Sequence, residues 1–282
     1  PAECLAVAVC LREEMYGGNA VPVVPALFID YVISKRWNLV AKASIARNYR
    51  YPSLDDLYFQ PGGNPDLEPE HGFTYDGGVE FQIARKCYLL KGNVVAFNSY
   101  IDDWILWTPN TKGFWQPSNV REVHNYGVEM TTDNMFVLSK NTKLNISGNF
   151  AWTSSKNYGE RINSNDASYG KQLCYIPEYS AAVTPRLLWK NWIFSYKWSY
   201  YSERFTTTSN EVSYITGRLK PYYMNDLSVE KRFSWKWVEL SVKGIVNNLF
   251  GSEYVTVLSR PMPRRNYELF LEIRPKFFGK KQ

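Results

Sequence analysis

Residues 142–152 read Thr-Lys-Leu-Asn-Ile-Ser-Gly-Asn-Phe-Ala-Trp, and apolar and polar side chains alternate along this stretch with a period of two. Leu144 and Ile146 fall on one side of an extended chain, whereas Lys143 and Asn145 fall on the other. Successive side chains of a β-strand point to opposite faces of its sheet. The stretch therefore predicts a strand with one face toward an apolar phase and one toward water.

The same period recurs at 73–83 and at 267–274, and helical spacing is not found at comparable length. We predict twelve strands, many of them longer than the five or six residues typical of globular sheets. A strand of about 12 residues, tilted by about 45°, covers about 28 Å, which suits a transmembrane β-barrel. The strands are expected at 3–16, 22–34, 37–50, 69–84, 88–107, 118–132, 140–157, 173–189, 192–207, 216–233, 236–250 and 263–277.

The composition combines many rings with net polarity. Aromatic residues make up 16% of the chain, although its mean hydropathy is −0.37. Membrane barrels carry aromatic girdles at both interfaces and polar side chains inside, whereas a soluble core rarely needs so many rings. No stretch approaches the roughly 18 uninterrupted apolar residues of a spanning helix, so any crossing of a bilayer is expected to use a closed sheet.

The expected connections alternate between very short and long from the second strand onward. Short turns on one rim and long loops on the other are typical of bacterial outer-membrane barrels, whose turns lie in the periplasm and whose loops lie outside. A soluble β-sandwich or propeller that binds carbohydrate is an alternative, because its hairpins also alternate. The turns are expected at 34–36, 85–87, 138–141, 190–191 and 234–235, and the loops at 51–68, 108–117, 158–172, 208–215 and 251–262.

Catalytic, metal and cofactor motifs are not found in the sequence. Four cysteines without CxxC spacing and two histidines do not suggest a metal site. Asp102 and Asp103 are neighbours in an expected strand and point to opposite faces, which does not suit a glycosidase. The net charge of +6 comes from interspersed residues, which disfavours nucleic acid as a partner. We expect neither an enzyme nor a cofactor.

Residues 50–58 read Arg-Tyr-Pro-Ser-Leu-Asp-Asp-Leu-Tyr, and residues 63–70 continue with Gly-Asn-Pro-Asp-Leu-Glu-Pro-Glu. Asn-Tyr-Gly-Val-Glu follows at 125–129 and Asn-Asn-Leu-Phe at 247–250. In this order the segments resemble TonB-dependent outer-membrane receptors, most of all those of the Bacteroides group. The resemblance covers nearly the whole chain, although the segment 263–265 lacks the glycine that usually opens the family's last strand.

The resemblance implies an all-β, antiparallel transmembrane β-barrel in the bacterial outer membrane, with about 12 of the 22 strands of such a barrel in this chain. Residues 1–282 would form the C-terminal part of the barrel domain, and the plug domain would lie outside this chain. The first and last strands are then expected to leave two open edges instead of pairing with each other.

For function, the resemblance implies a receptor for energy-coupled uptake of a scarce nutrient such as a ferric siderophore or cobalamin. The implied partners are outer-membrane lipid and the TonB inner-membrane complex, which acts through the plug. A passive porin-like or adhesive barrel is the alternative. Aromatic and basic residues at the outer strand ends are expected to bind the ligand, although the tryptophans fit an aromatic girdle equally well. These residues are Arg50, Tyr51, Trp104, Trp107, Trp115, Tyr201 and Arg204.

Overall fold

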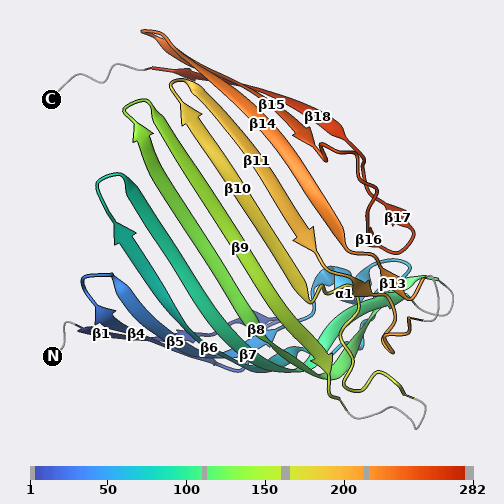
Figure 1. Ribbon diagram of the computed structural model, residues 1–282. Coiled ribbons are helices and arrows are strands. Elements are labelled where there is room, and N and C mark those ends of the chain that lie inside the picture. Colours follow the sequence, from blue (N-terminus) through green and yellow to red (C-terminus); the bar gives the residue numbers. More distant parts are fainter. Residues whose placement is uncertain (1–3, 110–112, 160–165, 213–215, 277–282) are drawn as a thin grey trace.

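The computed structural model describes residues 4–109, 113–159, 166–212 and 216–276. Twelve strands form one antiparallel sheet in which neighbours follow each other along the chain, and the sheet curves into an open trough (Figure 1). Along the sheet the strands are β1 (Leu5–Arg12), β4 (Val24–Ser34), β5 (Leu39–Arg50), β6 (Glu70–Ala84), β7 (Tyr88–Pro109), β8 (Trp115–Ser139), β9 (Thr142–Asn157), β10 (Tyr179–Trp189), β11 (Trp192–Tyr201), β14 (Tyr222–Ser234), β15 (Val238–Asn247) and β18 (Asn266–Pro275).

The twelve predicted strands are confirmed, but the first is shorter than the predicted segment 3–16. Gly17 and Gly18 adopt φ values of 57° and 85°, a backbone region that glycine enters without steric cost. They turn the chain into a small separate hairpin made of β2 (Met15–Tyr16) and β3 (Asn19–Ala20). The end of the predicted strand therefore belongs to a connection and not to the sheet.

Several further boundaries differ from the prediction. The strand expected at 192–207 ends at Tyr201, and the strand expected at 216–233 begins at Tyr222. The strand expected at 173–189 enters the sheet only at Tyr179, because the preceding residues, including Tyr175 with φ of 64°, are folded into a loop. The strand expected at 118–132 extends at both ends in β8, because its register with β7 continues from Trp115 to Phe136. Long-range pairing with β7, and not local pattern, sets the limits of β8.

The connections contain small elements that an alternating pattern cannot reveal. A short helix, α1 (Leu54–Tyr58), lies within the expected loop 51–68. Two ribbons, β12 (Arg204–Phe205) with β13 (Arg218–Leu219) and β16 (Val255–Val257) with β17 (Arg260–Pro261), lie in later connections. Among the described residues, no helix is long and apolar enough to span a membrane.

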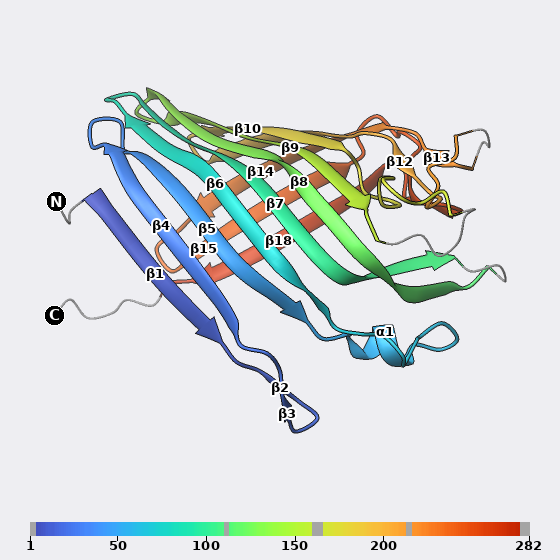
Figure 2. The same ribbon diagram turned by 90° about the horizontal axis from the view of Figure 1, so that it is seen from below.

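The tight turns and the long connections lie at opposite ends of the sheet, which confirms the predicted alternation (Figure 2). Helix α1 and the ribbons of β12, β13, β16 and β17 gather at one end, here called the loop rim. The other end is called the turn rim. It consists of residues 35–38, 85–87, 140–141, 190–191 and 235–237.

Neighbouring strands continue the two faces predicted from residues 142–152. Leu144 lies opposite Phe136 and Leu187, whereas Asn145 lies opposite Arg186. Asn145 and Arg186 also line a cavity of about 440 Å³ with polar residues of β11, β14 and β15. The apolar and the polar face are therefore properties of the sheet and not of a single strand.

Both outer strands of the sheet have one free edge. In the described residues β1 pairs with β4 alone and β18 with β15 alone, so the sheet is not closed into a ring. Apolar side chains at these edges are largely exposed, for example Val9 at 69% and Leu269 at 78%. The predicted open edges are confirmed.

Candidate functional site

Helix α1 is held in place by its first residues. Ser53 Oγ accepts a hydrogen bond from Asp56 N at 3.1 Å, and Asp56 Oδ2 accepts one from Ser53 N at 2.9 Å. This reciprocal capping box satisfies two backbone N–H groups at the helix start. It also places the Asp56 side chain, which is 6% exposed, between the helix and the sheet.

The Asp56 side chain connects α1 with residues of β5 and β7. Trp107 Nε1 donates a hydrogen bond to Asp56 Oδ1 at 2.8 Å, and Arg50 Nη1 lies 3.4 Å from Asp56 Oδ2. Burial would raise the pKa of this carboxyl, but hydrogen bonds from Trp107 and Ser53 and the charge of Arg50 outweigh burial and lower the pKa. The carboxylate is therefore charged at neutral pH.

Arg50 forms its main contact with Glu70, which the register of β5 and β6 places directly opposite. Arg50 Nε donates to Glu70 Oε2 at 2.7 Å, and Arg50 Nη2 donates to Glu70 Oε1 at 2.5 Å. Glu70 is 7% exposed and also accepts a hydrogen bond from Ile105 N at 2.8 Å. Such bidentate pairs fix geometry, so Arg50 connects the sheet to the connection that holds α1.

Apolar contacts complete the attachment of this connection. Leu57, Leu67 and Ile105 form a buried cluster between α1, the end of the connection and β7. Gly62 lies against the backbone of Trp115, where a Cβ atom would overlap with the Trp115 carbonyl oxygen. Only glycine permits this close approach, so the connection is packed against both β7 and β8.

A cleft of about 520 Å³ opens beside these contacts, and we call it the mouth cleft. The Phe59 ring meets the Trp107 ring edge to face at 5.9 Å between centroids, and the Trp115 ring lies 5.5 Å from that of Tyr175. The cleft thus combines aromatic surface with charged groups. Its lining residues are Ser53, Asp55, Asp56, Phe59, Trp107, Trp115, Val257 and Arg260.

A second aromatic group, the tyrosine cluster, consists of Tyr201, Tyr222 and Tyr254. The rings of Tyr201 and Tyr222 are 5.1 Å apart, and those of Tyr222 and Tyr254 are 4.9 Å apart. Arg204 is 4% exposed, lies 4.9 Å from the Tyr222 ring centroid and donates from Nη2 to Val255 O at 3.0 Å. A cation over an aromatic face is attracted by the ring, so Arg204 ties the ribbon of β16 to the cluster.

The structure divides the seven predicted residues. Trp107 and Trp115 line the mouth cleft. Arg50 lies behind the cleft in its pair with Glu70, and Tyr201 and Arg204 belong to the tyrosine cluster.

Tyr51 and Trp104 lie apart from the others. Tyr51 stacks on Tyr16 of β2 with 4.8 Å between ring centroids. Trp104 precedes Ile105, which packs against the connection, so Trp104 lies on the opposite face of β7. That face carries Tyr100, whose ring stacks on His124 at 4.2 Å. Trp104 therefore fits the aromatic girdle interpretation, and Trp107 does not.

Asp56, Phe59 and Arg260 belong to the site but were not predicted from the sequence. The spacing from Ser53 to Asp56 was a readable signal for a helix start. Arg260 reaches the cleft from a distant connection, and nothing in its local sequence indicates this.

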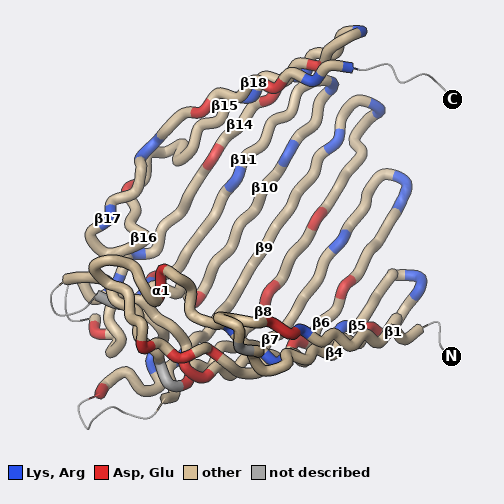
Figure 3. The backbone as a smooth tube through the Cα atoms, turned by 180° about the vertical axis from the view of Figure 1, so that it is seen from behind, with Lys and Arg blue, Asp and Glu red and all other residues tan. Residues whose placement is uncertain are grey.

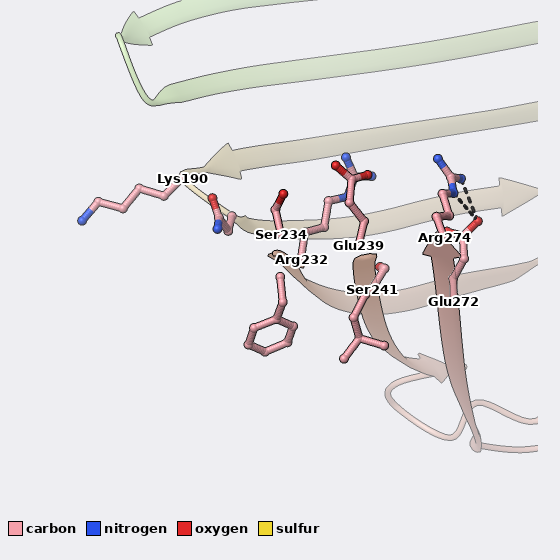
Figure 4. Close-up of a pocket in the computed structure, with 10 residues that line it drawn as sticks. Lys190, Arg232, Ser234, Glu239, Ser241, Glu272 and Arg274 are labelled. Carbon is pink, nitrogen blue, oxygen red and sulfur yellow. Dashed lines mark hydrogen bonds and ion pairs between the residues drawn. The ribbon is translucent and has the colours of Figure 1, made fainter. Parts of the chain in front are cut away.

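Another pocket, of about 280 Å³, lies near the turn rim on β14, β15 and β18 (Figure 4). Its arginines are paired with carboxylates: Arg274 Nη2 lies 2.7 Å from Glu272, and Arg232 Nε lies 2.5 Å from Glu230. The two arginines of this pocket are balanced within the chain, and we assign no ligand to it.

An antiparallel sheet of long strands, with an apolar and a polar face and with all long connections at one end, defines part of an outer-membrane β-barrel. A family model described as TonB dependent receptor-like, beta-barrel matches residues 16–249. The chain belongs to this family.

Curated relatives include two vitamin B12 transporters named BtuB. The one from Photobacterium profundum is 24% identical over 247 residues, which cover 83% of this chain and 36% of the relative. The one from Vibrio vulnificus is 29% identical over 89 residues, 31% of this chain and 14% of the relative. The matched part of this chain thus spans about a third of the length of the Photobacterium profundum relative.

Solved structures share the fold. The ferric enterobactin receptor PfeA of Pseudomonas aeruginosa, as a mutant, superposes with a TM-score of 0.66 at 17% identity, covering 97% of this chain and 43% of PfeA. The copper transporter OprC gives a TM-score of 0.65 at 17% identity, covering 96% of this chain and 45% of OprC. The chain spans less than half of each neighbour.

Proposed function

We propose that this chain serves energy-coupled uptake of a scarce nutrient across the outer membrane, and that the mouth cleft contributes to ligand binding. The carrying observation is that the connection of α1, the adjoining ends of β7 and β8, and the ribbon of β16 with β17 meet at one cleft with three aromatic side chains. Ring faces bind organic molecules, and Arg260 and Asp55 at the same cleft can bind an anionic group and a hydrogen-bond donor. A ferric siderophore or cobalamin offers this combination.

The relatives support the same class of function. BtuB is a vitamin B12 transporter and PfeA a ferric enterobactin receptor, so family members are transporters and receptors. In our proposal residues 1–282 are the C-terminal part of the barrel domain, a plug domain lies outside this chain, and the TonB inner-membrane complex supplies energy through the plug. The likeness to the Bacteroides group stays a prediction.

Uptake in cells tests the proposal. The complete receptor that carries this chain is expressed in a strain without its own cobalamin and siderophore receptors, and accumulation of labelled cobalamin and of labelled ferric siderophores is measured. We expect accumulation of one ligand, lost on deletion of TonB while surface binding remains. Accumulation that is unchanged without TonB would instead indicate the passive pore.

Substitutions at the cleft test the location of binding. The double variant Trp107→Ala and Trp115→Ala removes two of the three rings, and we expect ligand affinity to fall by tenfold or more, because buried rings dominate such sites (about 1–3 kcal/mol each). The matched control is Trp104→Ala, which removes a tryptophan of the same strand from the other face. Equal losses in both variants would contradict a site at the mouth cleft.

A further inference from the structure

The turn rim carries basic residues and no acidic ones. Each of its five turns contains at least one Lys or Arg. The connection at 51–69, at the other end of the sheet, contains four acidic residues and no basic one. Figure 3 shows Lys and Arg positions, in blue, at the tips of successive hairpins across the sheet. The turn-rim cations are Lys35, Arg36, Arg85, Lys86, Lys140, Lys190 and Lys236.

Several of these cations are not neutralised by the chain itself. In the part of the chain that the structure describes, Lys86, Lys140 and Lys190 form no ion pair with a carboxylate. Figure 4 shows Lys190 extending beyond the end of β10, whereas Arg274 is joined to Glu272. These three lysines therefore remain available to bind an anionic group.

Aromatic rings accompany the cations. Arg36 and Arg85 come from different turns, yet their guanidinium groups lie 5.5 Å and 5.8 Å from the centroid of the same ring, Trp37. Lys190 Nζ lies 5.4 Å from the centroid of the Trp189 ring. Tryptophan is favoured at the headgroup level of a bilayer, where its ring is apolar and its N–H remains hydrated.

The same combination occurs at the next hairpin of the sheet. Lys236 Nζ lies 5.0 Å from the Trp237 ring, and Trp237 is 63% exposed. Lys231 lies opposite Trp192 in β11, on the apolar face of β14, and its Nζ is 4.4 Å from the Trp192 ring. A lysine on an apolar face directs its ammonium group along the strand to the nearest water, as at membrane interfaces.

We propose that the turn rim binds the anionic headgroups of phospholipids in the bilayer leaflet that it faces. The cations occur at five successive turns, from β4 to β15, and are not gathered into one patch. A lipid annulus surrounds a barrel in this way, whereas an acidic protein partner would need one compact surface. The negative charge of phosphodiester groups complements the ammonium and guanidinium groups. Tryptophan rings favour the same headgroup level of the bilayer.

The test measures lipid selectivity of the complete receptor. It is reconstituted into phosphatidylcholine vesicles that contain pyrene-labelled phosphatidylglycerol or, in parallel, pyrene-labelled phosphatidylcholine, and energy transfer from tryptophan to pyrene reports the lipids in contact. We expect phosphatidylglycerol to be preferred, with a preference that decreases as salt is added. Each Lys or Arg near an anionic surface is expected to favour the anionic over the neutral lipid about fivefold at low salt.

Three variants locate the effect. The preference for phosphatidylglycerol should fall severalfold, toward equal binding of the two lipids, in the triple variant Lys86→Gln, Lys140→Gln and Lys190→Gln. The same three positions changed to Arg should keep it, which a purely structural role of the lysines would not predict. The charge-matched control, Lys171→Gln, Lys220→Gln and Arg265→Gln combined, removes three cations from the loop rim and should leave the preference unchanged. Heat-dependent mobility in gels verifies that each variant is folded.

The competing outcomes overturn the proposal. Equal binding of the two labelled lipids by the unmodified receptor would do so, as would equal losses in the two glutamine variants. Displacement of the phosphatidylglycerol signal by inorganic phosphate would indicate a site for free anions, and displacement by polyglutamate would indicate an acidic protein partner. We expect neither competitor to act at concentrations that leave the ionic strength unchanged.

Discussion

Trp107 Nε1 and Asp56 Oδ1 are joined by a hydrogen bond of 2.8 Å that connects β7 to helix α1. Asp56 is in turn close to Arg50, which holds Glu70 in a bidentate pair. These contacts form a continuous polar network behind the mouth cleft, and the same Trp107 ring lines the cleft. The position of Trp107, which we propose contacts the ligand, is therefore set by a buried carboxylate.

The first prediction concerns Asp56→Asn in the complete receptor. The amide still accepts a hydrogen bond from Trp107 but loses its charge and its attraction to Arg50. We expect the free energy of opening of α1 to fall by about 1.5–3 kcal/mol, the range for hydrogen bonds to a charged partner. Hydrogen exchange of residues 51–69, followed by mass spectrometry, measures it. The control is Asp55→Asn at an exposed neighbour, and equal exchange in both variants would contradict the prediction.

The second prediction concerns acid. The pKa of Asp56 is lowered in the folded loop, so its stabilisation is fully present above the ordinary carboxyl pKa and is lost as the pH falls through the folded-state pKa. Pepsin cleavage within residues 51–69 should therefore rise at low pH more steeply in the unmodified receptor than in Asp56→Asn. The ratio of the two rates cancels the pH dependence of pepsin, and a constant ratio would refute the assignment.

The strands were predictable because each needs one apolar and one polar face, which leaves an alternating pattern such as that around Ile146. Helix α1 was not predicted, because five residues are too few for a helical period and the cap of Ser53 and Asp56 defines it. The pairing of Arg50 with Glu70 depends on the register of β5 and β6 across an intervening connection. Such contacts follow from the assembled sheet and have no local pattern.

The third prediction separates the two faces of β9. Ile146 lies on the apolar face and Asn145 lines a polar cavity on the other side. Arginine at position 146 should destabilise the barrel by about 2–4 kcal/mol, the cost of a cation at mid-membrane, and arginine at position 145 much less. Urea titrations of the receptor folded into phosphatidylcholine vesicles measure the difference. Similar unfolding midpoints for Ile146→Arg and Asn145→Arg would contradict our assignment of the lipid-facing and lumen-facing sides of β9.

The fourth prediction concerns orientation and uses a native thiol. Cys87 is exposed on the turn rim, whereas Cys174 is buried, and burial raises the pKa of its thiol to about 11, which makes it unreactive. With Cys4 and Cys10 changed to Ser, a thiol reagent that cannot cross membranes should label Leu54→Cys on intact cells. It should reach Cys87 only after permeabilisation. Labelling of Cys87 but not of position 54 on intact cells would invert the topology.

The last prediction concerns the two open edges. β1 and β18 each expose one row of backbone N–H and C=O groups in the described structure, and such groups cost several kcal/mol each in lipid if they stay unpaired. In our proposal other strands of the receptor lie between these edges in the membrane. Cysteines at Val9 and Leu269, both exposed on the outer strands, should therefore form no disulfide within the complete receptor under oxidation.

A positive control for the oxidation uses β15 and β18, where Gly244 and Leu269 are register partners. Gly244→Cys with Leu269→Cys should crosslink readily, because facing residues of paired strands lie within disulfide reach. Residues 1–282 expressed alone should also fail to give a folded, heat-modifiable species, because both edges stay unpaired and recruit other strands. Efficient crosslinking of Val9→Cys with Leu269→Cys within one chain would instead show that these twelve strands close into a barrel by themselves.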